Sequence, residues 1–207
     1  MKVTTTETTQ GEGGGLRDAG TYHVVVNEVR EGESQKGKPI DGLTVSFEVF
    51  DGTTKGQAGK THTESFFLPT KKDEEKTASM KLRKLTAMAI AGNLMQPEQL
   101  GEELDIPFAS MVGQQMVVKF DHQMEMDGEG KYTIPSKYIQ VSYSDLFHVD
   151  DPAVKSVPKN ADALSLIDKA HRHPEQWFAW KKKRGAVPAS KPAASSVSAS
   201  DVDDLFE

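Results

Sequence analysis

One short run near the C-terminus combines aromatic and basic side chains. Residues 177–184, which we call the aromatic-basic segment, read Trp-Phe-Ala-Trp-Lys-Lys-Lys-Arg. Aromatic rings stack on unpaired bases while basic groups hold phosphates, so this combination is typical of proteins that bind single-stranded nucleic acid. The alternative is a helix end whose rings pack on the domain and whose cations are solvated. The candidate DNA-binding residues of this segment are Trp177, Trp180, Lys181 and Lys182.

The last seven residues, 201–207, form an acidic tip with four acids, no base and a few apolar side chains. Residues 185–200 before it are mostly Ala, Ser, Pro and Val, a composition that predicts a flexible tether. Acids gathered around an aromatic ring can dock in a basic pocket with an apolar floor. Two alternatives are a solubilising terminus and a tip that folds back on the aromatic-basic segment in competition with DNA. The candidate partner-binding residues are Asp201, Asp203, Asp204, Leu205 and Phe206.

The tip is similar to the C-terminal tips of bacterial and phage single-stranded DNA-binding proteins, which recruit replication and repair proteins. In those tips the phenylalanine is usually the last residue, whereas Glu207 follows Phe206 here. The resemblance implies replication or recombination proteins as partners of the tip.

The sequence has no pattern that predicts catalysis. The six histidines are scattered, and His171 and His173 have no nearby acid at metal-ligand spacing. No glycine-rich phosphate loop precedes a predicted helix, and no Ser/His/Asp order stands out. We therefore expect no enzyme, no metal and no cofactor; an enzyme would need a site that the sequence does not reveal.

Composition limits the class of protein. The 207 residues are 36% hydrophobic and lack cysteine, which excludes disulfides; the mean hydropathy of -0.54 predicts that part of the chain is unfolded. The net charge is -6, yet residues 155–184 carry 8 Lys/Arg against 3 Asp/Glu, so charge is used locally. No apolar run approaches the ~18 residues of a membrane helix. We expect a cytoplasmic protein without membrane contact, in the host cell if it is phage-encoded.

Alternating apolar residues predict strands at 21–29, 43–49, 60–68, 114–122 and 131–143. A helix is predicted over 77–91, with Leu82, Leu85 and Ala89 on one stripe. This order predicts a mainly β fold: a five-stranded OB-type Greek-key barrel with a helix between its third and fourth strands, plus a short C-terminal helix at 161–171 and disordered tails. The predicted parts are a disordered arm (1–18), the barrel (19–145), a linker with the helix and the aromatic-basic segment (146–184), the tether (185–200) and the tip (201–207).

Two segments of the sequence, together with this order of elements, resemble a group of tailed-phage single-stranded DNA-binding proteins of the OB fold. The segments are Ala19-Gly20-Thr21-Tyr22-His23-Val24 and Gly42-Leu43-Thr44-Val45-Ser46-Phe47-Glu48-Val49. The resemblance covers roughly residues 19–143. In OB folds a single strand crosses the face of the second and third strands, between the first and last hairpin loops. The candidate residues at those positions are Lys36, Lys38, Phe50, Lys55, Lys60, His62, Lys131 and Tyr132.

These features predict a protein that binds single-stranded DNA without sequence preference, in phage DNA replication or recombination, and recruits partners through its tip. Phe50 is expected to be an exposed aromatic on the binding face. Each lysine has a plainer interpretation as a solvated surface charge. The alternative function is an adaptor whose barrel binds another polypeptide, consistent with the negative charge of the core.

Overall fold

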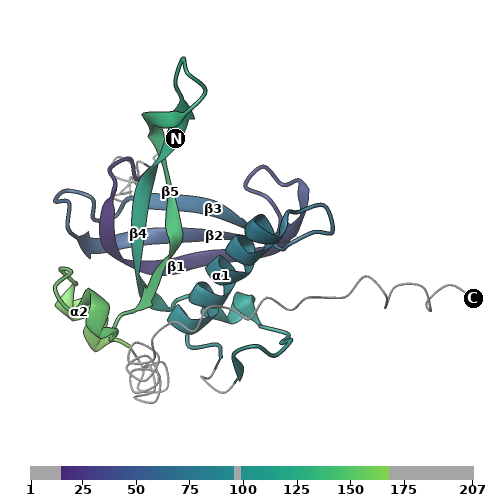
Figure 1. Cartoon of the computed structure of the whole chain (residues 1–207). Helices are drawn as coiled ribbons and strands as arrows, with labels where there is room; N and C mark the ends of the chain where they lie inside the picture. Colours follow the sequence, from purple (N-terminus) through teal and green to yellow (C-terminus); the bar gives the residue numbers. More distant parts are fainter. Residues whose placement is uncertain (1–14, 96–98, 168–207) are drawn as a thin grey trace, which may run out of the picture.

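The computed structural model describes residues 15–95 and 99–167. They form a mainly β structure around one five-stranded antiparallel sheet with the strand order β3-β2-β1-β4-β5 (Figure 1). Helix α1 lies between β3 and β4 in the sequence and contacts the two edge strands, β3 and β5. The strands are β1 (Gly20–Glu33), β2 (Pro39–Gly52), β3 (Thr61–Phe67), β4 (Gln115–Met126) and β5 (Tyr132–His148). The helices are α1 (Glu75–Ala91), α2 (Ala161–Ser165) and the 3-10 turns η2 (Phe108–Met111) and η3 (Pro152–Val154).

The core lies on one face of this sheet, as the alternation predicts. Each fully buried Val, Phe or Met side chain contributes about 1.5–3 kcal/mol of hydrophobic stabilisation. Helix α1 packs mainly against β5 and also contacts β3, and it buries Leu85, Met88 and Ala89. The predicted inward position of Leu82 is wrong, because this side chain is 50% exposed. The inward residues of the central strands are Tyr22, Val24, Val26, Leu43, Val45, Phe47, Val49, Met116, Val118 and Phe120.

The predicted limits of the domain need correction at both ends. Residues 15–18 belong to the predicted disordered arm, but Leu16 is buried and its backbone N–H donates to the Thr61 carbonyl at 2.7 Å. The Tyr22 hydroxyl also donates to the Asp18 carbonyl, at 2.9 Å. At the other end, β5 runs to His148, three residues beyond the predicted limit of the barrel. A single apolar residue in a polar stretch gives no periodicity, so the arm's attachment had no pattern to reveal it.

β3 and β5 are the edge strands of the sheet, and a side chain rather than a backbone ladder joins them. Glu64 on β3 accepts hydrogen bonds from the Val141 N–H of β5, from the Lys84 ammonium of α1 and from His62 Nε2. We call this arrangement the Glu64 bridge. Burial by itself would raise the pKa of Glu64, but His62, Lys84 and the Val141 N–H together hold it below its usual value.

The chain after β5 folds back onto the sheet. Val149 and Val154 form a small buried cluster with Val117 of β4. Asn160 caps α2, because its side chain accepts the Ala163 N–H at 2.9 Å. Helix α2 covers Ala161–Ser165, only the first part of the helix predicted over 161–171, and residues 168–171 lie outside the described residues.

A buried histidine ties this segment to the sheet. His23 is fully buried, and its Nδ1 accepts the Asn160 N–H at 3.2 Å. Its Nε2 therefore carries the proton and donates to the Gln115 amide oxygen at 2.9 Å. The Gln115 amide in turn donates to the Ala163 carbonyl at 2.7 Å. Burial lowers the pKa of His23, although the Gln115 contact opposes that change.

His23→Leu is expected to lower the free energy of unfolding by about 1–3 kcal/mol, because the Asn160 N–H and the Gln115 oxygen lose their buried partner. Since the pKa of His23 is lowered on folding, the unfolded chain takes up the proton first. Wild-type stability should therefore fall as the pH drops below 6.5, the ordinary histidine value. Urea unfolding above and below that pH measures both effects. A pH dependence identical in the variant and the wild type would contradict the assignment.

Candidate nucleic-acid interface

A groove of about 650 Å³ lies between the edge of β3 and the β4–β5 hairpin. The chain just before β1 and the β1–β2 loop supply its other walls, so segments from four parts of the sequence meet there. Gln35 of the loop donates to the Thr63 carbonyl of β3, which fixes the loop against the strand. The lining residues are Gly15, Leu16, Arg17, Gln35, His62, Thr63, Gln123, Lys137, Tyr138 and Ile139.

The groove is positive although the chain is negative. Arg17 and Lys137 are exposed at its walls, and its lining residues include no carboxylate. The Tyr138 side chain is 58% exposed, and Lys137 Nζ lies 5.2 Å from the centre of its ring. A guanidinium, an ammonium and an open aromatic face are the groups that hold a phosphate backbone and stack on a base.

His62 belongs to the floor of the groove and not to an outer strand face. Its ring meets the ring of Phe120 edge-on, with centroids 4.9 Å apart, and it donates to Glu64 at 3.2 Å. Its side chain is only 13% exposed. The sequence left the facing of this strand open, and the structure places His62, a candidate DNA-binding residue, in the lining of the groove.

The β4–β5 hairpin extends past the other strands of the sheet (Figure 1). Met126 pairs with Tyr132, so the two side chains share a face, and both are exposed. Asp127 holds the turn, since it accepts from the Thr133 hydroxyl at 2.6 Å and from the Lys131 N–H at 2.9 Å. The Thr133 bond, followed by the backbone N–H bonds, lowers the pKa of Asp127.

The other predicted residues are placed around the groove and not inside it. Lys36 and Lys38 are exposed on the β1–β2 loop beside Gln35, while Lys55 and Lys60 lie in the β2–β3 connection, Lys60 half-buried. Tyr132 is 67% exposed at the hairpin end, where Lys131 forms a 3.0 Å ion pair with Glu129.

Phe50 corrects a prediction. It was expected to be exposed, but it is half-buried, with its ring centre 5.4 Å from that of His23. The neighbouring strand β1 therefore covers part of the ring. The aromatic-basic segment and the tip, including Trp177, Trp180, Lys181 and Lys182, lie outside the described residues.

Sequence reasoning missed Arg17, Lys137 and Tyr138. Arg17 falls in the predicted disordered arm, where its neighbour Leu16 is the one apolar signal of attachment to the sheet. Lys137 and Tyr138 lie within the predicted last strand, and an adjacent cation and aromatic ring is a usable signal for single-strand binding.

Over 15–95 and 99–167, no three His, Asp or Glu side chains are grouped so that they could hold a metal ion. In the same part of the chain, no helix has the length and apolar character needed to cross a membrane.

Residues 4–159 match the model of a family described as "Protein of unknown function (DUF669)". The chain belongs to this family. The match spans the whole sheet, α1 and the segment up to Lys159, so the groove lies within the part of the chain that defines a DUF669 protein. No curated protein matches this DUF669 chain significantly.

Proposed function

We propose that this protein binds single-stranded DNA without sequence preference, on an OB-type barrel. The strand order β3-β2-β1-β4-β5, with α1 between β3 and β4, is the order of that fold. The Glu64 bridge between the two edge strands supports a partly open barrel. In an OB fold the ligand lies on the face bordered by the first and last hairpin loops, which is where the groove lies.

The observation that carries the proposal is the carboxylate-free groove with two cations and an open tyrosine in a chain of net charge -6. In this mechanism Arg17 and Lys137 hold successive phosphates, and Tyr138 stacks on a base. Exposed Lys36 and Lys38 on the adjacent loop extend the positive path. No covalent chemistry is involved, because affinity comes from counterion release and stacking.

The sequence supports a biological setting for this proposal. The resemblance of residues 19–24 and 42–49 to tailed-phage single-stranded DNA-binding proteins supports a role in phage DNA replication or recombination. The acidic tip at 201–207 is proposed to recruit replication or recombination proteins to the covered strand, through Asp201, Asp203, Asp204, Leu205 and Phe206.

A second candidate is a protein-interaction adaptor, favoured by the exposed apolar side chains on the hairpin. Met124, Met126 and Tyr132 are each at least 43% exposed. Exposed apolar residues gathered in one place mark binding surfaces for proteins as well as for bases. In this alternative the hairpin binds a polypeptide and the groove has no DNA.

Fluorescence anisotropy with a labelled single strand of ~30 nucleotides and the matching duplex tests the proposal. Tighter binding of the single strand, weakening steeply as salt rises, is the expected result. The logarithm of the binding constant should fall linearly with the logarithm of the salt concentration, with a slope of about 0.7 for each phosphate contacted, so the slope gives the number of these contacts. No binding of either DNA at low salt would overturn the proposal and favour the adaptor.

A further inference from the structure

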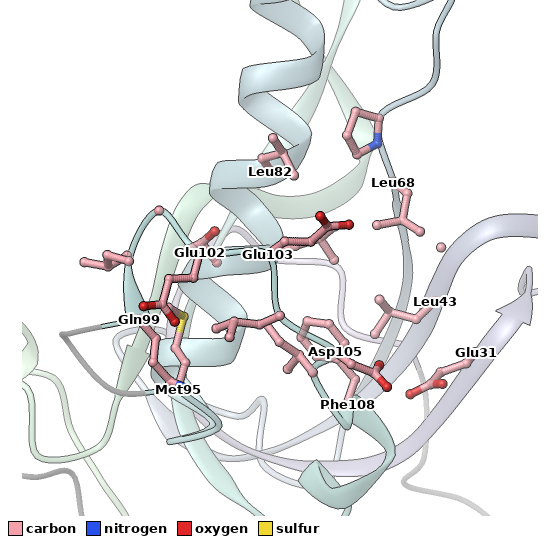
Figure 2. Close-up of a pocket in the computed structure, with 18 residues that line it drawn as sticks. Glu31, Leu43, Leu68, Leu82, Met95, Gln99, Glu102, Glu103, Asp105 and Phe108 are labelled. Carbon is pink, nitrogen blue, oxygen red and sulfur yellow. The ribbon is translucent and has the colours of Figure 1, made fainter.

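A second hollow, of about 580 Å³, has a chemistry opposite to that of the groove. It lies between α1, the start of β2 and the chain at 99–108 (Figure 2). Leu43 and Leu85 are buried at its floor, while Leu68 and Leu82 are 47% and 50% exposed. The exposed position of Leu82 on an otherwise buried helix face thus leaves an apolar surface uncovered. We call this hollow the acidic pocket.

Four carboxylates line the acidic pocket, and no lysine or arginine does: Glu31, Glu102, Glu103 and Asp105. Figure 2 shows the carboxylates of Glu31 and Asp105 turned toward each other. Glu31 accepts the Ala109 N–H at 3.2 Å. Within the described chain, none of the ion pairs involves these four groups. Like charges gathered beside an apolar floor repel one another, so the pocket favours an occupant that is both apolar and cationic.

We propose that the acidic pocket holds the aromatic-basic segment, residues 177–184, of the same chain. The segment has three aromatic residues followed directly by four basic ones. The aromatic side chains match the apolar floor of the pocket, and the positive charges match its carboxylates. Trp177 and Trp180 cover the exposed leucines, and Lys181–Arg184 neutralise the carboxylates. The acidic tip, which has the opposite charge, does not fit this pocket.

The connecting chain has a length comparable with the distance to the pocket. Phe108 of the pocket precedes Gln115 by seven residues, so Phe108 and Gln115 lie at most ~25 Å apart, and the Gln115 side chain is bonded to Ala163 of α2, four residues before Ile167. From Ile167 to Trp177 there are ten residues, which reach up to ~35 Å. A short connection also gives the segment a high effective concentration at the pocket.

Tryptophan fluorescence tests this inference without DNA, so its outcome is independent of the proposed function. The chain has only two tryptophans, and both lie in the segment. In the full-length protein their emission should be shifted to shorter wavelength, and acrylamide should quench it several-fold less than in a free peptide of residues 175–184. Glu102→Lys with Glu103→Lys, and separately Leu82→Ser, should return both values toward those of the peptide.

The control variants carry the same changes outside the pocket: Glu125→Lys with Glu129→Lys, and Met126→Ser. All these positions are exposed, so the fold should persist, which circular dichroism checks. Peptide-like emission in the wild type would overturn the inference. So would protection that the pocket variants leave unchanged, because the segment would then pack elsewhere. Protection that disappears on dilution would identify a second copy as the source of the segment and would also overturn it.

Discussion

Glu64→Ala is expected to lower the free energy of unfolding by about 3 kcal/mol. The side chain is 14% exposed and joins three elements, through Lys84 of α1, Val141 of β5 and His62 of β3. Removing one partner of a buried ion pair costs about 3–5 kcal/mol, because the other charge and its hydrogen-bond donors stay buried without an acceptor. The lower end applies, since the Lys84 side chain keeps 22% of its exposure to water.

Urea unfolding followed by circular dichroism measures this loss. Glu125→Ala is the control, because Glu125 is exposed on the hairpin and its replacement should change stability by no more than about 0.5 kcal/mol. Equal values for the two variants would show that the Glu64 bridge does not hold β3 to β5.

The Glu64 bridge also predicts a pH dependence. The pKa of Glu64 is held below its ordinary value of 4.5 in the folded protein. The unfolded chain therefore binds this proton first as the pH falls. The stabilisation is fully present above pH 4.5 and is lost as the pH drops through the folded pKa. The difference between the wild type and Glu64→Gln should be constant above pH 4.5 and shrink below it.

The sequence predicted the strands that obey a simple alternation. Leu43, Val45, Phe47 and Val49 are buried as the period of two requires. β3 gave no clear facing, because His62 and Glu64 share the inner face with Phe66. Two polar residues can point inward here only because Phe120, Lys84 and Val141 receive them. Those partners lie 20 or more residues away, so a local pattern contains no trace of them.

The candidate site was less predictable than the fold, for a related reason. The position of an exposed lysine such as Lys55 cannot be predicted from a local pattern, since a solvated charge has nearly the same free energy on any exposed surface. Arg17 and Lys137 lie 120 positions apart in the sequence, and they line one groove because Leu16 bonds to Thr61 of β3 and the Glu64 bridge holds β5 to that strand. Sequence could name the kind of chemistry, but only the topology brings those two cations together.

Tyr138→Ala is expected to weaken binding of single-stranded DNA by about 1–3 kcal/mol, or roughly five- to 150-fold. The ring is 58% exposed in the groove and is flanked by the ammonium of Lys137. A base that stacks on it gains contact with an aromatic face and a nearby cation. Anisotropy titrations at one fixed salt concentration measure the loss, because affinity for DNA depends steeply on salt.

Tyr138→Phe separates stacking from hydrogen bonding, since it keeps the ring and removes only the hydroxyl; its affinity should equal that of the wild type.

Arg17→Glu with Lys137→Glu tests the electrostatic contribution to DNA binding, and should lower the salt slope by about 1.4, as two phosphate contacts are lost. Lys71→Glu with Lys72→Glu makes the same charge change at exposed positions outside the groove, and should leave most of the slope intact. Equal effects of the two double variants would mean that DNA responds to net charge, and that the groove is not its binding site.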